Sequence, residues 1–270
     1  MESTSALPDF EPANKSRPVS FDPGIRRGFF SSTQQLRAFF FSQTQDNHQL
    51  AVFVHGFAGN YLSTWGLIPH LLWTGADTDA ILRNWDFLFI GYETRKIHTY
   101  LDIAERIGTE WGYCFSGSPP YPRKYAKVSL FGHSLGTLGI RQFLCATAKH
   151  HESLAQCLHS VTLFGSPLAG SKLAYLANVT HPIAKALTPL NPQLRMLRVW
   201  SEGSFKYSPW PPVRVVVGQG DWIAGTEMHE LVTWPGDLTP EITTLGHSDL
   251  VRPDAWQDSV VLNSVRMVLR

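Results

Sequence analysis

The stretch that decides the fold is Val128-Ser-Leu-Phe-Gly-His-Ser-Leu-Gly136, in which an apolar run leads directly into a Gly-x-Ser-x-Gly motif. The run Val128–Phe131 predicts a buried strand, and the apolar pattern from Leu135 to Ala148 predicts a helix. The two glycines of the motif let neighbouring chains approach a sharp turn without a Cβ clash. Ser134 at the tip of that turn would project its hydroxyl above the sheet, which makes it a candidate nucleophile. His133 lies too close along the chain to reach this hydroxyl, so we assign it a structural role.

Similar apolar runs recur on both sides of this motif. Each run is continuous, as in strands buried on both faces of a parallel sheet, and longer amphipathic segments separate the runs. These runs predict strands over 50–54, 87–90, 161–164 and 213–217; a last strand is predicted at 241–245, and the predicted helices are 97–111, 135–148 and 256–269. Strands that alternate with helices predict an α/β fold with a mostly parallel, doubly wound sheet. We expect a loose N-terminal arm over 1–28 and a single domain over 29–270.

The composition excludes nucleic-acid binding and indicates a folded chain. The chain carries 23 Lys and Arg against 22 Asp and Glu, a net charge of +1, and shows no basic stripe that would neutralise nucleic-acid phosphates. Hydrophobic residues make up 43% and charged residues 17%, which is typical of a chain with a large core. We therefore expect a globular protein that does not bind nucleic acid.

Location and cofactors are predicted from what the sequence contains. Met1–Pro18 holds three acidic residues and no apolar segment of the secretory type, which predicts a cytoplasmic protein. Polar residues, glycine and proline interrupt the longest uncharged stretch, 47–76, so we expect no transmembrane segment, and peripheral contact with a membrane stays open. The three cysteines have no CxxC spacing and lack further metal ligands at usable distance. We expect no disulfide, metal or organic cofactor.

A serine nucleophile needs a base to take its proton and a carboxylate to orient that base. When the serine occupies a strand-to-helix elbow, the acid follows a later strand and the histidine comes last. Asp221 follows the valine-rich run 213–217, and His247 lies between the last predicted strand and the closing helix. We predict these two as acid and base. The competing residues, each a weaker candidate, are Glu227, Asp237, Asp249, His98, His181 and His229.

The developing oxyanion of a bound ester needs two backbone N–H donors. The loop after the strand 50–54 reads His55-Gly-Phe-Ala-Gly59, and the elbow helix points its N-terminus at the serine. We predict the N–H groups of Phe57 and Leu135 as the donors. His55 is expected to fix the loop by a hydrogen bond and to take no part in proton transfer.

These motifs together resemble the α/β-hydrolase serine esterases of the lipase-like group. The matching segments, in order, are 55–59, 132–136, 165–171, 220–221 and 246–253. The ending His247-x-x-Leu-Val-x-Pro253 is particularly similar to serine esterases related to the inositol deacylases of glycosylphosphatidylinositol anchors. The resemblance implies hydrolysis of carboxylic esters. Thr137 departs from the pattern, since a second glycine is common there.

The segment 171–212 follows a predicted strand and is rich in apolar residues interrupted by prolines. It is typical of a cap that covers the serine and forms an acyl-chain wall, or equally of ordinary helices that close the sheet edge. We expect a small-molecule or lipid ester as substrate and an acyl-enzyme intermediate. Two alternatives remain at this point: an acyltransferase that uses the same residues, and a non-catalytic ligand receptor with this fold.

Overall fold

The computed structural model describes most of the chain from Arg27 onward. The described residues are 27–33, 36–42, 48–61, 63–76, 78–116, 124–147, 156–171, 174, 181–189, 191–207, 211, 213–219, 221, 223, 237–253 and 259–270. The predicted arm lies outside them except for its last two residues, which begin the first strand. The part of the predicted cap that is described consists of two helices with their flanking residues.

A sheet of eight strands forms the centre of the molecule, in the order β1-β2-β4-β3-β5-β6-β7-β8. Six neighbouring strands are parallel, and β1 and β2 add an antiparallel edge beside β4. The strands are β1 (Arg27–Thr33), β2 (Leu36–Ser42), β3 (Gln49–Val54), β4 (Asp86–Ile90), β5 (Lys127–His133), β6 (Leu158–Phe164), β7 (Val213–Gly218) and β8 (Glu241–Thr243). The predicted parallel α/β fold is confirmed, and β1 and β2 are additions that the sequence analysis did not include.

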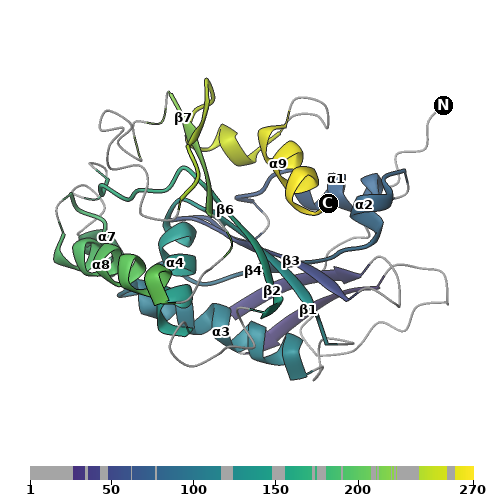
Figure 1. Ribbon diagram of the computed structural model, residues 1–270, viewed down its shortest axis with the longest axis horizontal. Helices are drawn as coiled ribbons and strands as arrows, with labels where there is room; N and C mark the ends of the chain where they lie inside the picture. The colour runs from purple at the N-terminus through teal and green to yellow at the C-terminus, as the bar shows by residue number, and fades with distance from the viewer. Residues whose placement is uncertain are drawn as a thin grey trace.

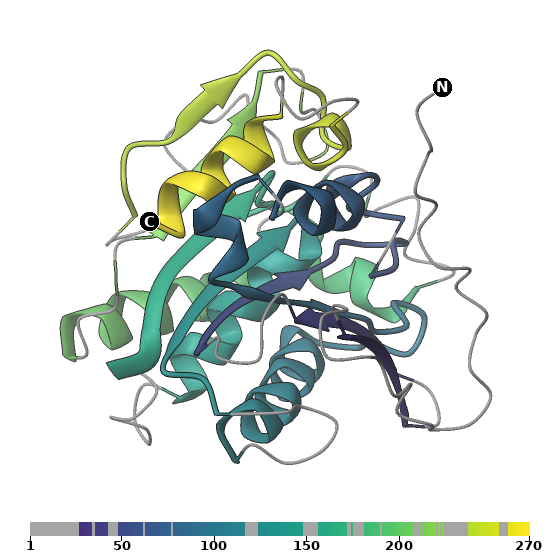
Figure 2. The same ribbon diagram turned by 90° about the vertical axis from the view of Figure 1, so that its right-hand side faces the viewer.

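Helices cover both faces of the sheet, which gives three layers (Figures 1 and 2). One face carries α3 (Tyr100–Ser116), α4 (Leu135–Thr147), α7 (Pro182–Ala186) and α8 (Pro192–Tyr207). The other carries α1 (Ile68–Gly75), α2 (Ala80–Arg83) and α9 (Val260–Val268), and the short 3₁₀ helix η2 (Asp249–Val251) contacts α9. Helix α8 packs against α4, so this part of the predicted cap lies in the helical layer beside the elbow helix.

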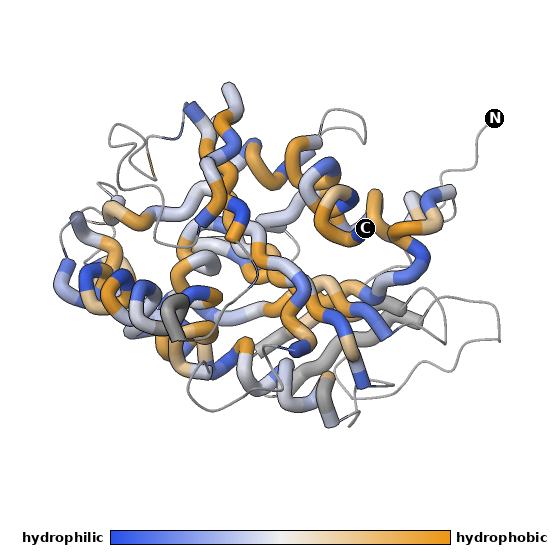
Figure 3. The backbone as a smooth tube through the Cα atoms, in the orientation of Figure 1, coloured by the Kyte–Doolittle hydropathy of each residue, from blue (hydrophilic) through white to orange (hydrophobic). Residues whose placement is uncertain are grey.

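The strand sequence explains why both faces are covered. Along β3, Leu50, Val52 and Val54 belong to the core under α3 and α4, whereas Ala51 and Phe53 belong to the core under α1 and α9. All five are buried, as expected for a strand whose side chains alternate between two apolar layers. Figure 3 shows the hydrophobic residues that recur along these central strands.

The strand order also determines where a ligand can bind. The chain runs from β3 outward to β4 and then returns to β5 on the other side of β3. In open α/β sheets, ligands bind outside the carboxyl ends of the strands at such a reversal. The loop after β3 and the turn after β5 therefore lie together at the expected site.

Candidate active site

The turn after β5 has the strained backbone that the motif predicts. Ser134 has φ of +52°, a left-handed conformation that is unusual for a residue with a side chain, and its N–H donates to the carbonyl of Phe164 at 2.9 Å. A Cβ at position 132 would lie 2.8 Å from Ile140 Cδ1, and one at position 136 would lie 2.4 Å from the carbonyl oxygen of His55. Both flanking glycines are therefore required by close packing around the serine.

The predicted acid and base lie in contact. His247 Nδ1 is 2.7 Å from Asp221 Oδ2, and the Asp221 side chain is fully buried. The second carboxylate oxygen accepts a hydrogen bond from the N–H of Ile223 at 3.1 Å. A histidine that donates from Nδ1 to a carboxylate keeps Nε2 available to accept a proton.

The competing carboxylates lie elsewhere. Asp237 forms a buried ion pair with Arg141 of α4 at 2.6 Å, and Asp249 is exposed on η2. Glu227 and His229 lie outside the described residues. His98 is exposed at the start of α3, and His181 contacts the ring of Phe57 at a centroid distance of 4.9 Å. Among the described candidates, only Asp221 and His247 form an acid–base pair.

Gly165, directly after β6, makes room for this pair. It has φ of +55°, and a Cβ at this position would lie 2.9 Å from Asp221 Oδ2 and 3.0 Å from His247 Nδ1. No function was predicted for this glycine from the sequence. The available signal was its position, directly after a buried strand in the Gly-Ser-Pro-Leu-Ala-Gly-Ser segment.

His133 has the structural role expected of it. Its Nε2 donates to the backbone carbonyl of His247 at 3.0 Å, which ties the elbow to the loop that carries the base. Burial, followed by the proximity of His247, lowers the pKa of His133 from 6.5 to about 3. The ring is therefore neutral at physiological pH and serves to position the His247 loop.

The loop after β3 is fixed by His55, as expected. His55 Nε2 accepts the N–H of Tyr92 at 3.1 Å, and Nδ1 donates to the carbonyl of Gly56 at 2.8 Å. Burial lowers the pKa of His55 from 6.5 to about 4, which keeps the ring neutral. Tyr92 stacks on this ring and donates its hydroxyl to the His55 carbonyl.

The two predicted oxyanion donors lie beside the serine. Phe57 lines the same cavity as Ser134, and Leu135 is the first residue of α4. The N–H groups in the first turn of a helix have no partner within the helix, so that of Leu135 is available to a ligand. This position is compatible with a role as donor.

Thr137 connects the elbow to the next loop. Its hydroxyl donates to the carbonyl of Ser134 at 2.6 Å and accepts the hydroxyl proton of Ser166, with the two oxygens 2.6 Å apart. Thr137 is fully buried. A glycine, which is common at this position, has no hydroxyl. Thr137 therefore adds two hydrogen bonds that hold the strained turn.

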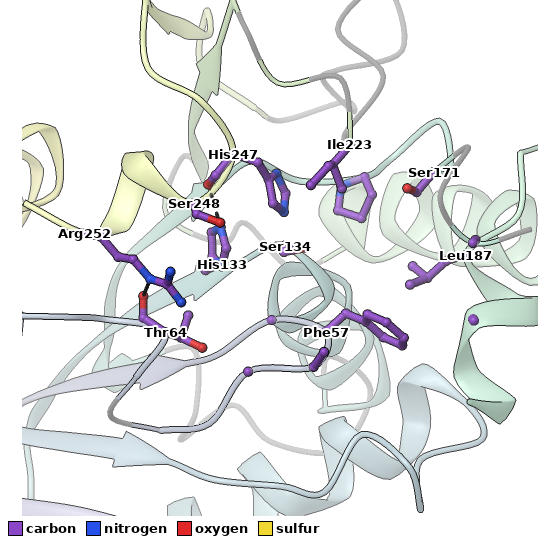
Figure 4. Close-up of a pocket in the computed structure, with 16 residues that line it drawn as sticks. Phe57, Thr64, His133, Ser134, Ser171, Leu187, Ile223, His247, Ser248 and Arg252 are labelled. Atoms are coloured by element: carbon purple, nitrogen blue, oxygen red, sulfur yellow. Dashed lines mark hydrogen bonds between the residues drawn. The ribbon is translucent and has the colours of Figure 1, made fainter. Parts of the chain in front are cut away.

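These residues surround a cavity of about 460 Å³ (Figure 4). Its lining includes Ser134 and His247, and Figure 4 shows the His247 ring beside Ser134. The side toward α7 carries the apolar side chains of Phe57, Leu187 and Ile223 together with Ser171, whereas the opposite side carries Thr64, Ser248 and Arg252. The arrangement brings together a serine hydroxyl, a histidine held by a buried carboxylate, and a cavity of the size of a small ligand.

Two further findings concern the part of the chain that the structure describes. It contains no group of three or more His, Cys, Asp or Glu side chains that could hold a metal ion. None of its helices has the length and apolar character needed to span a bilayer.

Comparison with known families identifies the chain. Residues 44–187, just over half of its length, match the family described as "Putative serine esterase (DUF676)". The chain belongs to this serine esterase family. The match contains the loop after β3 and the elbow, and it ends before Asp221 and His247. The protein is a serine hydrolase that acts on ester bonds.

Solved structures with the same fold are distant in sequence. The mature lipase BlEst2 of Bacillus licheniformis is 15% identical with a TM-score of 0.57, over 91% of this chain and 99% of the lipase. An S-formylglutathione hydrolase of Agrobacterium tumefaciens is 11% identical with a TM-score of 0.55, over 93% and 98% of the two chains. Est1E of Butyrivibrio proteoclasticus is 13% identical with a TM-score of 0.50, over 90% and 95%. Comparison with curated proteins gives no match. These likenesses establish the α/β-hydrolase fold.

Proposed function

We propose that the protein hydrolyses carboxylic esters with an apolar acyl group through an acyl-enzyme intermediate on Ser134. The observation that carries the proposal is the 2.7 Å contact between His247 Nδ1 and buried Asp221, in a cavity that also exposes Ser134. Asp221 would orient His247 and stabilise its protonated form.

In the first half of the reaction, Ser134 Oγ attacks the carbonyl carbon of the ester while its proton passes to His247 Nε2. The carbonyl oxygen becomes an oxyanion, to which the N–H groups of Phe57 and Leu135 donate. The intermediate then collapses, the bond to the alcohol oxygen breaks, and His247 returns the proton to the departing alcohol.

In the second half, His247 takes a proton from water, and the hydroxide attacks the acyl carbon. The Ser134 Oγ–acyl bond breaks, and Oγ recovers the proton from His247 as the carboxylic acid leaves. The same carbonyl carbon is attacked in both half-reactions, so His247 and the N–H groups of Phe57 and Leu135 act in each of them.

An apolar acyl group is supported by the wall beside Ser134. Ala184 belongs to α7 and Leu187 follows it, and Phe57 and Ile223 face the same space. We propose that Ala184 and Leu187, which belong to the predicted cap, bind the acyl chain. Each buried methylene stabilises the bound state by about 0.8 kcal/mol.

Labelling with a fluorophosphonate tests the nucleophile. We expect one labelled residue, Ser134, with no labelling and a loss of p-nitrophenyl ester turnover in Ser134→Ala. Ser264→Ala, which removes a buried serine of α9, is the matched control and retains both. Labelling of another serine in the wild-type protein contradicts the assignment, and product that forms only with an added alcohol would make the protein an acyltransferase.

A further inference from the structure

Arg252 brings a permanent positive charge to the cavity. Of the described residues that line the cavity, it is the one that stays charged at every physiological pH. It follows η2 and is exposed. No carboxylate of the described residues lies within 4.0 Å of its guanidinium, in contrast to Arg141, which is paired with Asp237.

The side chain is held in place by the chain segment after the loop of β3. Arg252 Nε donates to the backbone carbonyl of Thr64 at 3.4 Å. Its aliphatic part lies over Gly66, where a Cβ would be 3.4 Å from Arg252 Cγ. Because only Nε is used in this way, the two terminal nitrogens remain available to a ligand.

The position of Arg252 divides the cavity by chemistry. In Figure 4, Arg252, Thr64 and Ser248 lie on one side of Ser134, and Phe57 and Leu187 lie on the other. An ester bound with its carbonyl at Ser134 has two halves, one for each side. An apolar acyl chain fits the side of Leu187, which leaves the alcohol half at the cation.

We propose that the preferred substrates carry an anionic group, a carboxylate or a phosphate, on the alcohol half of the ester, and that Arg252 binds this group. The inference rests on the proposed function, because it takes Ser134 as the point where the carbonyl reacts. A guanidinium donates two parallel hydrogen bonds to carboxylate or phosphate oxygens, and the hydroxyls of Thr64 and Ser248 line the same side.

The positive charge of Arg252 acts electrostatically on His133, the residue before Ser134. It adds to burial and to the proximity of His247 in lowering the pKa of His133. A cation that acts on the residue next to Ser134 can also act on an anionic group bound beside that serine. It would therefore contribute to binding in the ground state, before the carbonyl reacts.

The experiment compares matched phenyl esters with one medium-length acyl group. The phenol carries hydrogen, a 4-carboxylate, a 4-phosphate or a 4-trimethylammonium group, and kcat/KM is measured for each. The preference ratio of a charged ester is its kcat/KM divided by the kcat/KM of the neutral ester. In the wild-type protein we expect ratios above one for the anionic esters and below one for the cationic ester, with 0.5 M salt bringing both toward one.

Substitution of Arg252 tests the source of this preference. In Arg252→Gln the anionic ratio falls by about 10- to 100-fold, the range expected for hydrogen bonds to a charged group. Arg252→Lys keeps the charge without the bidentate geometry and gives an intermediate ratio. Arg195→Gln, which removes an exposed charge from α8, is the matched control and leaves the ratio unchanged. The relative size of the carboxylate and phosphate ratios identifies the preferred anion.

Three outcomes would overturn the proposal. These are equal wild-type ratios for all four esters, an anionic ratio that survives in folded Arg252→Gln, and a preference for a carboxylate on the acyl half, measured with a glutaryl phenyl ester. In each case, labelling of Ser134 by a fluorophosphonate would still support the acyl-enzyme mechanism of the proposed function, and the third outcome would in addition refute its apolar acyl group. Loss of that labelling in the wild-type protein would refute the proposed function itself.

Discussion

Gly56 lies where the loop after β3 meets the elbow, and an alanine there should damage the reaction. Its Cβ would lie 2.7 Å from Ser134 Cβ and 3.1 Å from His133 Nδ1. Ordinary van der Waals contact begins at 3.4 Å, so the loop or the elbow must move by 3.4 − 2.7 = 0.7 Å. A displacement near 1 Å can cost about 10²-fold in rate, so we expect kcat/KM to fall by about 10- to 100-fold in Gly56→Ala.

The assay combines p-nitrophenyl ester turnover with the rate of fluorophosphonate labelling and the urea unfolding midpoint. Gly112→Ala is the matched control, because Gly112 lies within α3 and a Cβ there meets nothing within 4 Å. This control should keep full activity and gain about 0.5–1 kcal/mol of stability from the helix propensity of alanine. Full turnover in Gly56→Ala would refute the assigned role of the close contact between loop and elbow.

Three further predictions concern the acid, the buried histidines and the acyl wall. Asp221→Asn should lower kcat by about 10⁴-fold because His247 loses the partner that selects its tautomer, and a variant at full rate would exclude the pairing. The pKa values of His55 and His133 are lowered to about 4 and about 3, so between pH 6.5 and 4 only the unfolded state takes up these protons. The free energy of unfolding, measured in urea at pH 7, 6 and 5, should therefore fall by about 1.4 kcal/mol per pH unit for each histidine below pH 6.5, and a flat profile would contradict their neutral burial. With esters from acetyl to octanoyl, kcat/KM should rise by about fourfold per methylene, and Leu187→Ser should flatten this rise, whereas a wild-type optimum at acetyl would exclude the acyl wall.

The parallel part of the fold was predictable because its signals are local. Each inner strand is a continuous apolar run, and the elbow motif marks the strand-to-helix turn at Ser134. Asp221 and His247 could be selected because each follows a predicted strand in the expected order. The structure brings these two side chains together from positions 26 residues apart.

Other features depend on contacts that the sequence does not reveal. The antiparallel strands β1 and β2 are joined at Gln34-Gln35, which lacks the glycine or asparagine of a recognisable hairpin turn. The need for Gly165 appears only when the Asp221–His247 pair packs over it. The position of Arg252 in the cavity depends in the same way on its packing over Gly66. In all three cases, the determining neighbour is distant in sequence or carries no local signal.

The backbone of Ser134 has a consequence for the evolution of this protein. A left-handed conformation costs a residue with a Cβ about 1–2 kcal/mol, and glycine would avoid that cost. Judged by folding alone, serine is thus an inferior residue at this position, and under the proposed mechanism its hydroxyl offsets that cost by reacting with the ester. A mutant library screened only for thermal tolerance should accumulate glycine at position 134 and lose turnover while it gains stability. Laboratory selection for robustness must therefore include an activity screen in every round.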